Sequence, residues 1–212
     1  MIKHRLAACV ALFGLLTASS ALAQQAVDAS GPIDLHKVDP ALVGLGDFGR
    51  PEGFMERQLR RWSKQWEGSK FEDLPELERL RDGLAARLPR TEQPAAIVHG
   101  DYRLDNVLVD ANDQPAAVID WKMATVGDPI TDLALLLVYQ RLASGMGENA
   151  IADAAAADGY PSEDELLARY QRGSERDLSN FGWYLGLASY KLATIAEGIH
   201  FRFVNGKTVG PG

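Results

Sequence analysis

Apolar residues recur at helical spacing over most of this chain, with a short central stretch that follows a different pattern. Residues 53–67 carry an apolar stripe and predict a helix that ends at Gly68. A second helix is predicted over residues 75–88. It has Pro75 in its first turn, where the missing N–H costs nothing, and it stops before Pro89.

Further helices are predicted in the second half of the chain. Asp128 followed by Pro129 is a good helix start, and the apolar run "ITDLALLLVYQRL" that follows predicts a largely buried helix. Ser162 and Glu165 have the spacing of a capping box before "LLARYQ". The last helix, about residues 178–204, is apolar over most of its circumference. Interrupting polar residues indicate the central helix of a core rather than a membrane span.

The central stretch contains short β-branched runs. "AAIVH", "NVLVD" and "AAVID" have strand character, and the turn cluster "ANDQP" separates the last two. The predicted fold class is therefore α+β: a mostly helical domain with a small β-hairpin. If residues whose numbers sum to about 226 face each other in this hairpin, Asn106 lies opposite Asp120 at its open end.

The N-terminal part differs from the rest. Basic residues, a short apolar run and an Ala-Leu-Ala ending at Ala23 are typical of a secretory signal peptide over residues 1–23. An uncleaved anchor or a buried helix are the alternatives. Residues 24–34 are expected to be a linker, and residues 35–212 the folded domain. The glycine spacing within residues 44–49 matches a nucleotide loop, but no strand leads into it, so a turn-rich loop is expected.

Composition narrows the function. The chain has 212 residues, 46% of them hydrophobic, and a net charge of −7, which argues against binding nucleic acid through a basic face. A single cysteine excludes a disulfide framework and a thiolate zinc site.

The candidate chemistry lies around the hairpin, in the string "HGDYRLDN". Asn106 and Asp120 are hard oxygen ligands of the kind that Mg²⁺ takes. Asp101 lies five residues before Asn106, close enough to accept the proton of an attacking hydroxyl. His99 is expected to serve as a hydrogen-bonding post and Gly100 to give the loop backbone freedom. A metal-dependent phosphohydrolase that uses Asp101, Asp105 and Asp120 is an alternative reading of the same carboxylates.

The segments "IVHGDYRLDNVLVD" and "AVIDWKMATVGDPITDLALLL" resemble the aminoglycoside phosphotransferase and choline kinase family, whose fold is protein-kinase-like. The resemblance is nearest to the phosphotransferase domains associated with acyl-CoA dehydrogenases. It implies transfer of the γ-phosphoryl group of ATP to a small-molecule hydroxyl, with Asp101 as catalytic base and Mg²⁺ on Asn106 and Asp120. It also implies catalytic-loop roles for His99 and Arg103. The residues that it implies for structural support are Gly127, Asp128 and the loop-bracing Asp132. Lys122 departs from the family pattern, in which a Glu usually follows the Trp.

The resemblance covers the C-terminal lobe of a kinase, and no strand pair with a lysine fits before it. A partner protein or a homodimer is therefore expected to complete the ATP site. The alternative is a catalytically inactive remnant, or pseudokinase, that acts as a binding module. The acceptor is a small-molecule hydroxyl, of hydroxyacyl type by analogy with the dehydrogenase-linked domains. Kinase chemistry favours a cytoplasmic location, and a working leader would favour an exported or periplasmic one.

Overall fold

The computed structural model of this protein describes residues 31–90, 93–111, 115–146 and 160–207. The predicted leader at residues 1–23 and most of the predicted linker at 24–34 lie outside these ranges. The chain divides into two compact units. The first comprises the described residues within 1–52 and 92–179, and the second those within 53–91 and 180–212. Within the described ranges, no helix is both long and apolar enough to cross a membrane.

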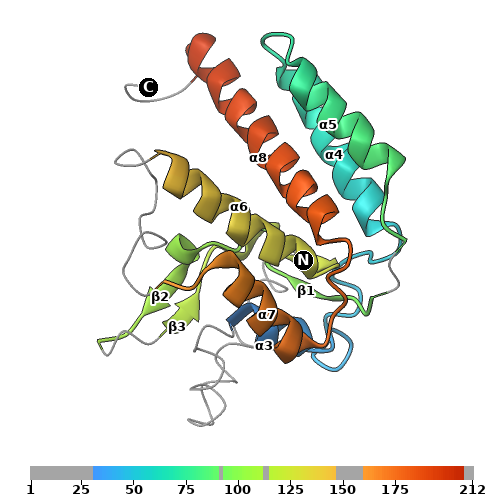
Figure 1. The fold of residues 1–212 in the computed structure, drawn as a ribbon, viewed down its shortest axis with the longest axis vertical. Coiled ribbons are helices and arrows are strands. Elements are labelled where there is room, and N and C mark those ends of the chain that lie inside the picture. The colour runs from blue at the N-terminus through green and yellow to red at the C-terminus, as the bar shows by residue number, and fades with distance from the viewer. Residues whose placement is uncertain (1–30, 91–92, 112–114, 147–159, 208–212) are drawn as a thin grey trace. The chain divides into compact units, whose positions relative to one another are not determined.

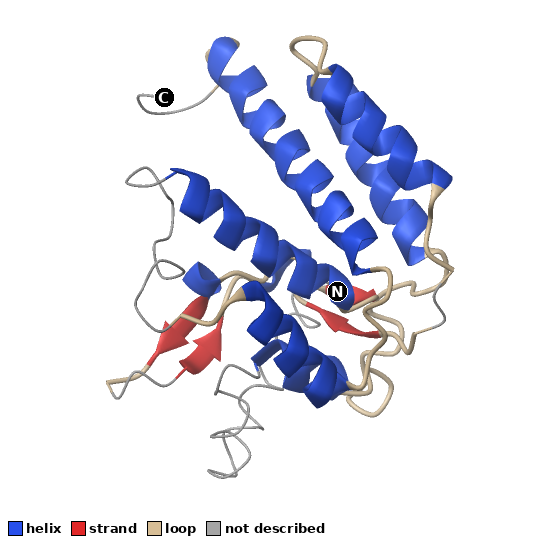
Figure 2. Cartoon of the chain, viewed as in Figure 1, coloured by secondary structure: helices blue, strands red, loops and turns tan. Residues whose placement is uncertain are grey.

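The first unit combines helices with short strands (Figures 1 and 2). Its elements, in chain order, are α3 (Gly31–Lys37), β1 (Ala96–Val98), the 3-10 turn η1 (Leu104–Asn106), β2 (Val107–Val109), β3 (Pro115–Val118), the 3-10 turn η2 (Trp121–Met123), β4 (Thr125–Gly127), α6 (Ile130–Met146) and α7 (Glu163–Ser174). Helix α3 packs against β1 and α7. The sequence pattern predicted a linker up to residue 34 and no helix over residues 31–37, so it missed α3, and it also missed β4.

Two antiparallel strand pairs lie in this unit. Strand β1 pairs with β4, with Ile97 opposite Val126. Strand β2 pairs with β3 in the predicted hairpin, with Val107 opposite Val118. The predicted register was wrong by one residue, because these paired numbers sum to 225 rather than 226. A register irregularity follows between Leu108 and Val109, where the strand opposite advances by an extra residue.

The core of the first unit lies under these strands. Leu35, Leu45, Ile97 and Trp121 form its buried cluster. Helix α6 is apolar around most of its circumference, and buried residues run without a break from Asp132 to Val138. A helix of this kind can only be accommodated inside a core, as the sequence predicted. Asp132 is therefore a carboxylate set into an apolar helix.

The second unit consists of helices. Its elements are α4 (Phe54–Ser69), α5 (Pro75–Ala86) and α8 (Phe181–Val204). Helix α8 packs along both of the others. The indole Nε1 of Trp183 donates a hydrogen bond to the Leu84 carbonyl at 3.0 Å, and Tyr190 donates one to the Ser63 hydroxyl at 3.3 Å. All three helices were predicted within a few residues of these bounds.

Candidate active site

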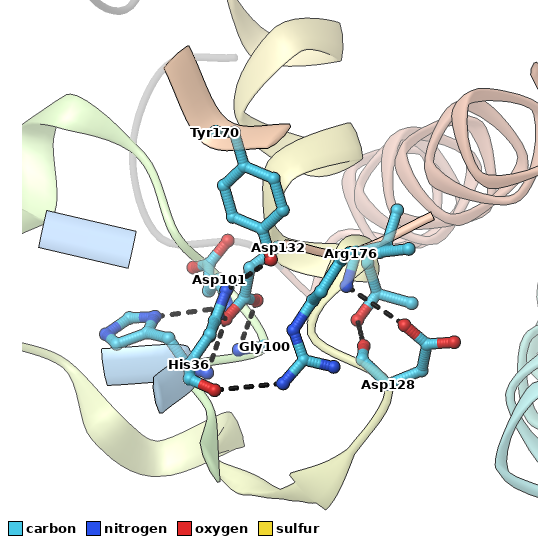
Figure 3. A network of polar contacts seen from close by, with 10 residues as sticks. His36, Gly100, Asp101, Asp128, Asp132, Tyr170 and Arg176 are labelled. Atoms are coloured by element: carbon cyan, nitrogen blue, oxygen red, sulfur yellow. Dashed lines mark hydrogen bonds and ion pairs between the residues drawn. The ribbon is translucent and has the colours of Figure 1, made fainter. Parts of the chain in front are cut away.

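The loop between β1 and η1 carries the sequence "HGDYR" and is held by Asp132, from the first turn of α6 (Figure 3). The Oδ2 atom of Asp132 accepts the backbone N–H of His99 at 2.6 Å, and its Oδ1 accepts the N–H of Gly100 at 2.8 Å. The Asp132 side chain is fully buried. Both carboxylate oxygens therefore serve to fix two consecutive peptide groups just before Asp101.

Gly100 gives this loop a conformation that other residues rarely adopt. Its φ angle is 81°, in the left-handed region. A Cβ atom at this position would lie 2.5 Å from the carbonyl oxygen of Met123. The glycine thus permits both the turn and the close approach of the η2 backbone.

His99 is buried, and its two ring nitrogens contact backbone groups. Nδ1 accepts the N–H of Asp101 at 3.2 Å, and Nε2 lies 2.9 Å from the carbonyl oxygen of Ile119. Because a carbonyl oxygen can only accept, Nε2 carries the ring proton. The ring also packs edge-on against Trp121, with the ring centroids 4.7 Å apart. His99 therefore links the loop to the end of the hairpin and acts as a positioning group.

Asp101 itself is partly exposed, and one of its carboxylate oxygens is engaged. The hydroxyl of Tyr139, on α6, donates to Asp101 Oδ1 at 3.1 Å. Burial, followed by the proximity and hydrogen bond of Asp101, raises the pKa of Tyr139 to about 12, so the phenol remains a donor at neutral pH. The contact fixes one oxygen of this partly exposed carboxylate.

A cation lies next to this pair. The guanidinium of Arg103 is centred 5.3 Å from the Tyr139 ring centroid, and its Nη1 lies 3.4 Å from Asp105 Oδ2. The Nε atom of Arg103 is buried and has no hydrogen-bond partner among the described residues. Positive charge is thus held beside the Asp101 carboxylate.

The two predicted metal ligands lie where the hairpin opens. The Nδ2 of Asn106 donates to the carbonyl oxygen of Asp101 at 2.9 Å, so its Oδ1 is the end of the amide that can ligate a cation. Ile119, and not Asp120, lies opposite Asn106, and its N–H donates to the Asn106 carbonyl at 2.8 Å. Asp120 follows with a φ of 67°, outside the strand ladder. The direct pairing of Asn106 with Asp120 was therefore wrong. Both residues nevertheless lie at the open end of the hairpin, Asn106 just before β2 and Asp120 shortly after β3.

Asp120 forms an ion pair with Lys122, the residue that departs from the family pattern. The two side chains meet at 2.9 Å, from Nζ to Oδ2. The hydrogen bond to Asp120 and its charge raise the pKa of Lys122. The Lys122 side chain is 69% exposed, so a competing cation can displace it into solvent at little cost.

The remaining predicted residues lie where α6 begins. Gly127 ends β4 opposite Ala96, and Asp128 Oδ1 accepts the N–H of Ile130 at 3.0 Å. Within the described ranges, no group of three or more His, Cys, Asp or Glu side chains could hold a metal ion. Asp101, Asp105 and Asp120 therefore do not form the carboxylate cage that the phosphohydrolase alternative requires.

Four residues of this region were not predicted from the sequence. Tyr139 lies two helical turns after Asp132, and this spacing would have indicated that both share one face of α6. His36, Tyr170 and Arg176 come from α3, α7 and the segment after α7. No local pattern connects them to the loop, because each is at least 60 residues away from it in the sequence.

Comparisons with known proteins agree with this geometry. The model of the phosphotransferase enzyme family matches residues 5–171. Acyl-CoA dehydrogenase family member 11 of Rattus norvegicus is 31% identical over 184 residues, which cover 81% of this chain and 23% of that protein. The chain thus spans about a quarter of the length of the curated relatives that it matches.

Solved structures give the fold. A Ralstonia eutropha protein described as an aminoglycoside phosphotransferase superposes with a TM-score of 0.75 at 32% identity, over 85% of this chain and 56% of that chain. An aminoglycoside-3'-phosphotransferase of type VIII superposes with a TM-score of 0.55 at 26% identity, over 76% of this chain and 58% of that chain. The predicted fold class is thereby confirmed. With its braced loop and a family match over most of its length, this chain belongs to the phosphotransferase enzyme family and has a protein-kinase-like fold.

Proposed function

We propose that this protein transfers the γ-phosphoryl group of ATP to the hydroxyl group of a small molecule. The observation that supports this most directly is the Asp101 carboxylate, fixed at one oxygen by Tyr139 and presented by a loop that Asp132 holds. A positioned carboxylate of this kind is what phosphoryl transfer needs as proton acceptor, since its catalysis rests on positioning and charge.

In the proposed reaction, Asp101 orients the acceptor hydroxyl and takes its proton through the oxygen that Tyr139 does not contact. The hydroxyl oxygen bonds to the γ-phosphorus, and the bond from that phosphorus to the bridging oxygen of ADP breaks. Arg103, whose buried Nε has no hydrogen-bond partner in the part of the chain that the structure describes, supplies positive charge toward the phosphoryl group. His99 and Gly100 keep the loop in place throughout.

Asn106 and Asp120 fit a magnesium site in their chemistry. They offer one amide oxygen and one carboxylate. Mg²⁺ is usually bound through one or two carboxylates together with phosphate oxygens and water, so a cage of protein ligands is not required. When bound, the ion would neutralise charge on the phosphate groups. The Lys122 ammonium at 2.9 Å occupies part of the same carboxylate, and it would have to move aside.

The acceptor is proposed to be a hydroxyacyl compound, because the curated relatives are acyl-CoA dehydrogenase family members. A second copy of the chain or a partner protein is proposed to complete the nucleotide site. The described residues of the first unit contain only two-stranded sheets, which is less than a nucleotide-covering β-lobe needs.

The Lys122–Asp120 ion pair favours a second candidate, a binding module that retains the loop without turnover. Titration calorimetry with Mg·ATP separates the two. Micromolar binding supports the enzyme, and no heat at millimolar nucleotide supports the binding module.

The decisive variant for the enzyme is Asp101→Asn. ADP release in the presence of hydroxyacyl acceptors is expected to fall by about 10²–10⁴-fold, because the amide cannot accept the proton. Asp177→Asn is the matched control, since this exposed carboxylate contacts Ser179 in a surface turn. The variant pair should have equal melting temperatures. Activity that survives in Asp101→Asn would refute the assignment of the base.

A further inference from the structure

The Asp132 carboxylate, together with its two hydrogen bonds to the catalytic loop, forms a brace that depends on Asp132 being ionised. Its two oxygens accept backbone N–H groups at 2.6 and 2.8 Å, from His99 and Gly100. Protonation would place a hydrogen on one of these oxygens. That O–H would then point at a backbone N–H, which is also a donor. One of the two loop amides would lose its acceptor. A buried carboxylate is costly to keep charged unless further donors stabilise it.

A further donor comes from His36, on α3 (Figure 3). Its Nε2 lies 3.4 Å from Asp132 Oδ2, and its Nδ1 lies 2.9 Å from the hydroxyl of Tyr170 on α7. Because a carboxylate only accepts, Nε2 carries a proton toward Asp132, and Nδ1 shares a hydrogen bond with the Tyr170 hydroxyl. Arg176 holds the backbone on the same side, donating from Nη2 to the His36 carbonyl at 2.9 Å. His36 is thus fixed from three directions against the brace.

We propose that His36 is a positioning residue of this site, which keeps Asp132 ionised and thereby holds the loop amides that present Asp101. The proposal rests on the proposed function for the role of Asp101, but the effect of His36 on Asp132 stands independently of it. His36 touches no reacting group, so its contribution passes through the brace.

The electrostatics around Asp132 agree with this role. Burial acts to raise the pKa of Asp132. Its hydrogen bond to His36, then the proximity of the His36 and His99 rings and the hydrogen bond from the Gly100 N–H, bring that pKa below its ordinary value. Two phenols also face this carboxylate, Tyr102 from the loop and Tyr170 from α7, and burial raises the pKa of each, so both stay neutral. Two further charged groups, Arg176 and Asp128, lie near Tyr170; Arg176 acts to lower the pKa of Tyr170 and Asp128 to raise it.

A purely packing role for His36 is the competing explanation, since its ring also stands edge-on to Tyr170 with the centroids 5.8 Å apart. Two substitutions separate the roles. His36→Gln retains an N–H donor near the position of Nε2, whereas His36→Phe retains a ring and removes the donor. Leu35→Ala is the control for lost packing, because Leu35 is buried on the same helix in the apolar cluster with Ile97 and Trp121.

The first measurement is the melting temperature as a function of pH. Loss of a hydrogen bond to a charged group should move the acid limb of the His36→Phe profile upward by about 1–2 pH units relative to His36→Gln. Leu35→Ala should lower the melting temperature equally at every pH. Identical acid limbs for the Gln and Phe variants would overturn the proposal. If His36→Phe does not fold, Tyr170→Phe provides the same test, since it frees Nδ1 and should shift the limb in the same direction.

The second measurement uses the amide protons of His99 and Gly100 in ¹H–¹⁵N spectra. The 2.6 Å hydrogen bond to Asp132 should place the His99 amide proton downfield. This signal should keep its position in His36→Gln and move upfield at pH 5 in His36→Phe, and an unmoved signal would count against the proposal. The kcat for phosphoryl transfer should fall about 100-fold in His36→Phe, with KM little changed. Should no variant or wild type show activity while the spectra shift as expected, the proposed reaction fails and the role of His36 stands.

Discussion

Replacing Gly100 with alanine should destabilise the first unit strongly, and the structure gives the size of the effect. An L-residue held at a φ of 81° costs about 1–2 kcal/mol. The new Cβ would also lie 2.5 Å from the Met123 carbonyl oxygen, and an overpacked contact costs about 1–3 kcal/mol. The sum, about 2–5 kcal/mol, is a large part of the total stability of an ordinary domain.

The same substitution at Gly83 provides a control of opposite sign. Gly83 lies inside α5, and an added Cβ there meets no atom within 4 Å. Alanine should stabilise this helix by about 0.5–1 kcal/mol, because glycine loses more backbone entropy on folding. Urea unfolding monitored by circular dichroism measures both variants. If Gly100→Ala unfolds at the wild-type midpoint, the left-handed conformation and the close contact with η2 are wrong.

Three further predictions concern single side chains. Asp132→Asn should cost about 3–5 kcal/mol in urea unfolding at pH 7, because one amide end must face a loop N–H. The pKa of Asp132 is lowered in the folded protein, so its contribution is present above about pH 4 and lost as the pH falls through the folded pKa. The penalty should therefore shrink in acid, and a constant penalty would contradict this. Ser162→Ala removes the cap of α7 and should cost about 1 kcal/mol, with the exposed Ser179→Ala as comparison. Lys122→Ala should tighten Mg²⁺ binding in calorimetry, whereas Lys64→Ala should leave it unchanged.

Local rules accounted for most of the helices. The capping box of Ser162 and Glu165 is formed by both side-chain hydrogen bonds, and Pro75 begins α5. These signals lie within one helical turn of the element they define, which is why the sequence alone reveals them. Helix α3 was missed because it begins with Gly31 and Pro32, which are typical of turns.

Features that depend on distant pairing could not be predicted in this way. Strand β4 has three residues and exists through its pairing with β1, about 30 residues earlier. The hairpin register was wrong by two residues at Val109 and by one at Leu108 and Val107, because the alternation of side chains does not reveal which residues pair. The contact between His36 and Asp132 joins residues 96 apart in the sequence. Long-range contacts of this kind are decided by packing, and the motif around Asp101 gave no indication of them.

The division of the chain has a consequence for its synthesis. Neither unit is continuous, because residues 53–91 interrupt the first and α8 completes the second. A ribosome that has released residues 1–150 has produced the loop of Asp101 without the segment that contains Tyr170 and Arg176. Long-range closure slows folding. The nascent protein must therefore wait for its last third before the contacts that hold His36 can form. Cutting the gene at a single internal position would therefore yield no self-sufficient half.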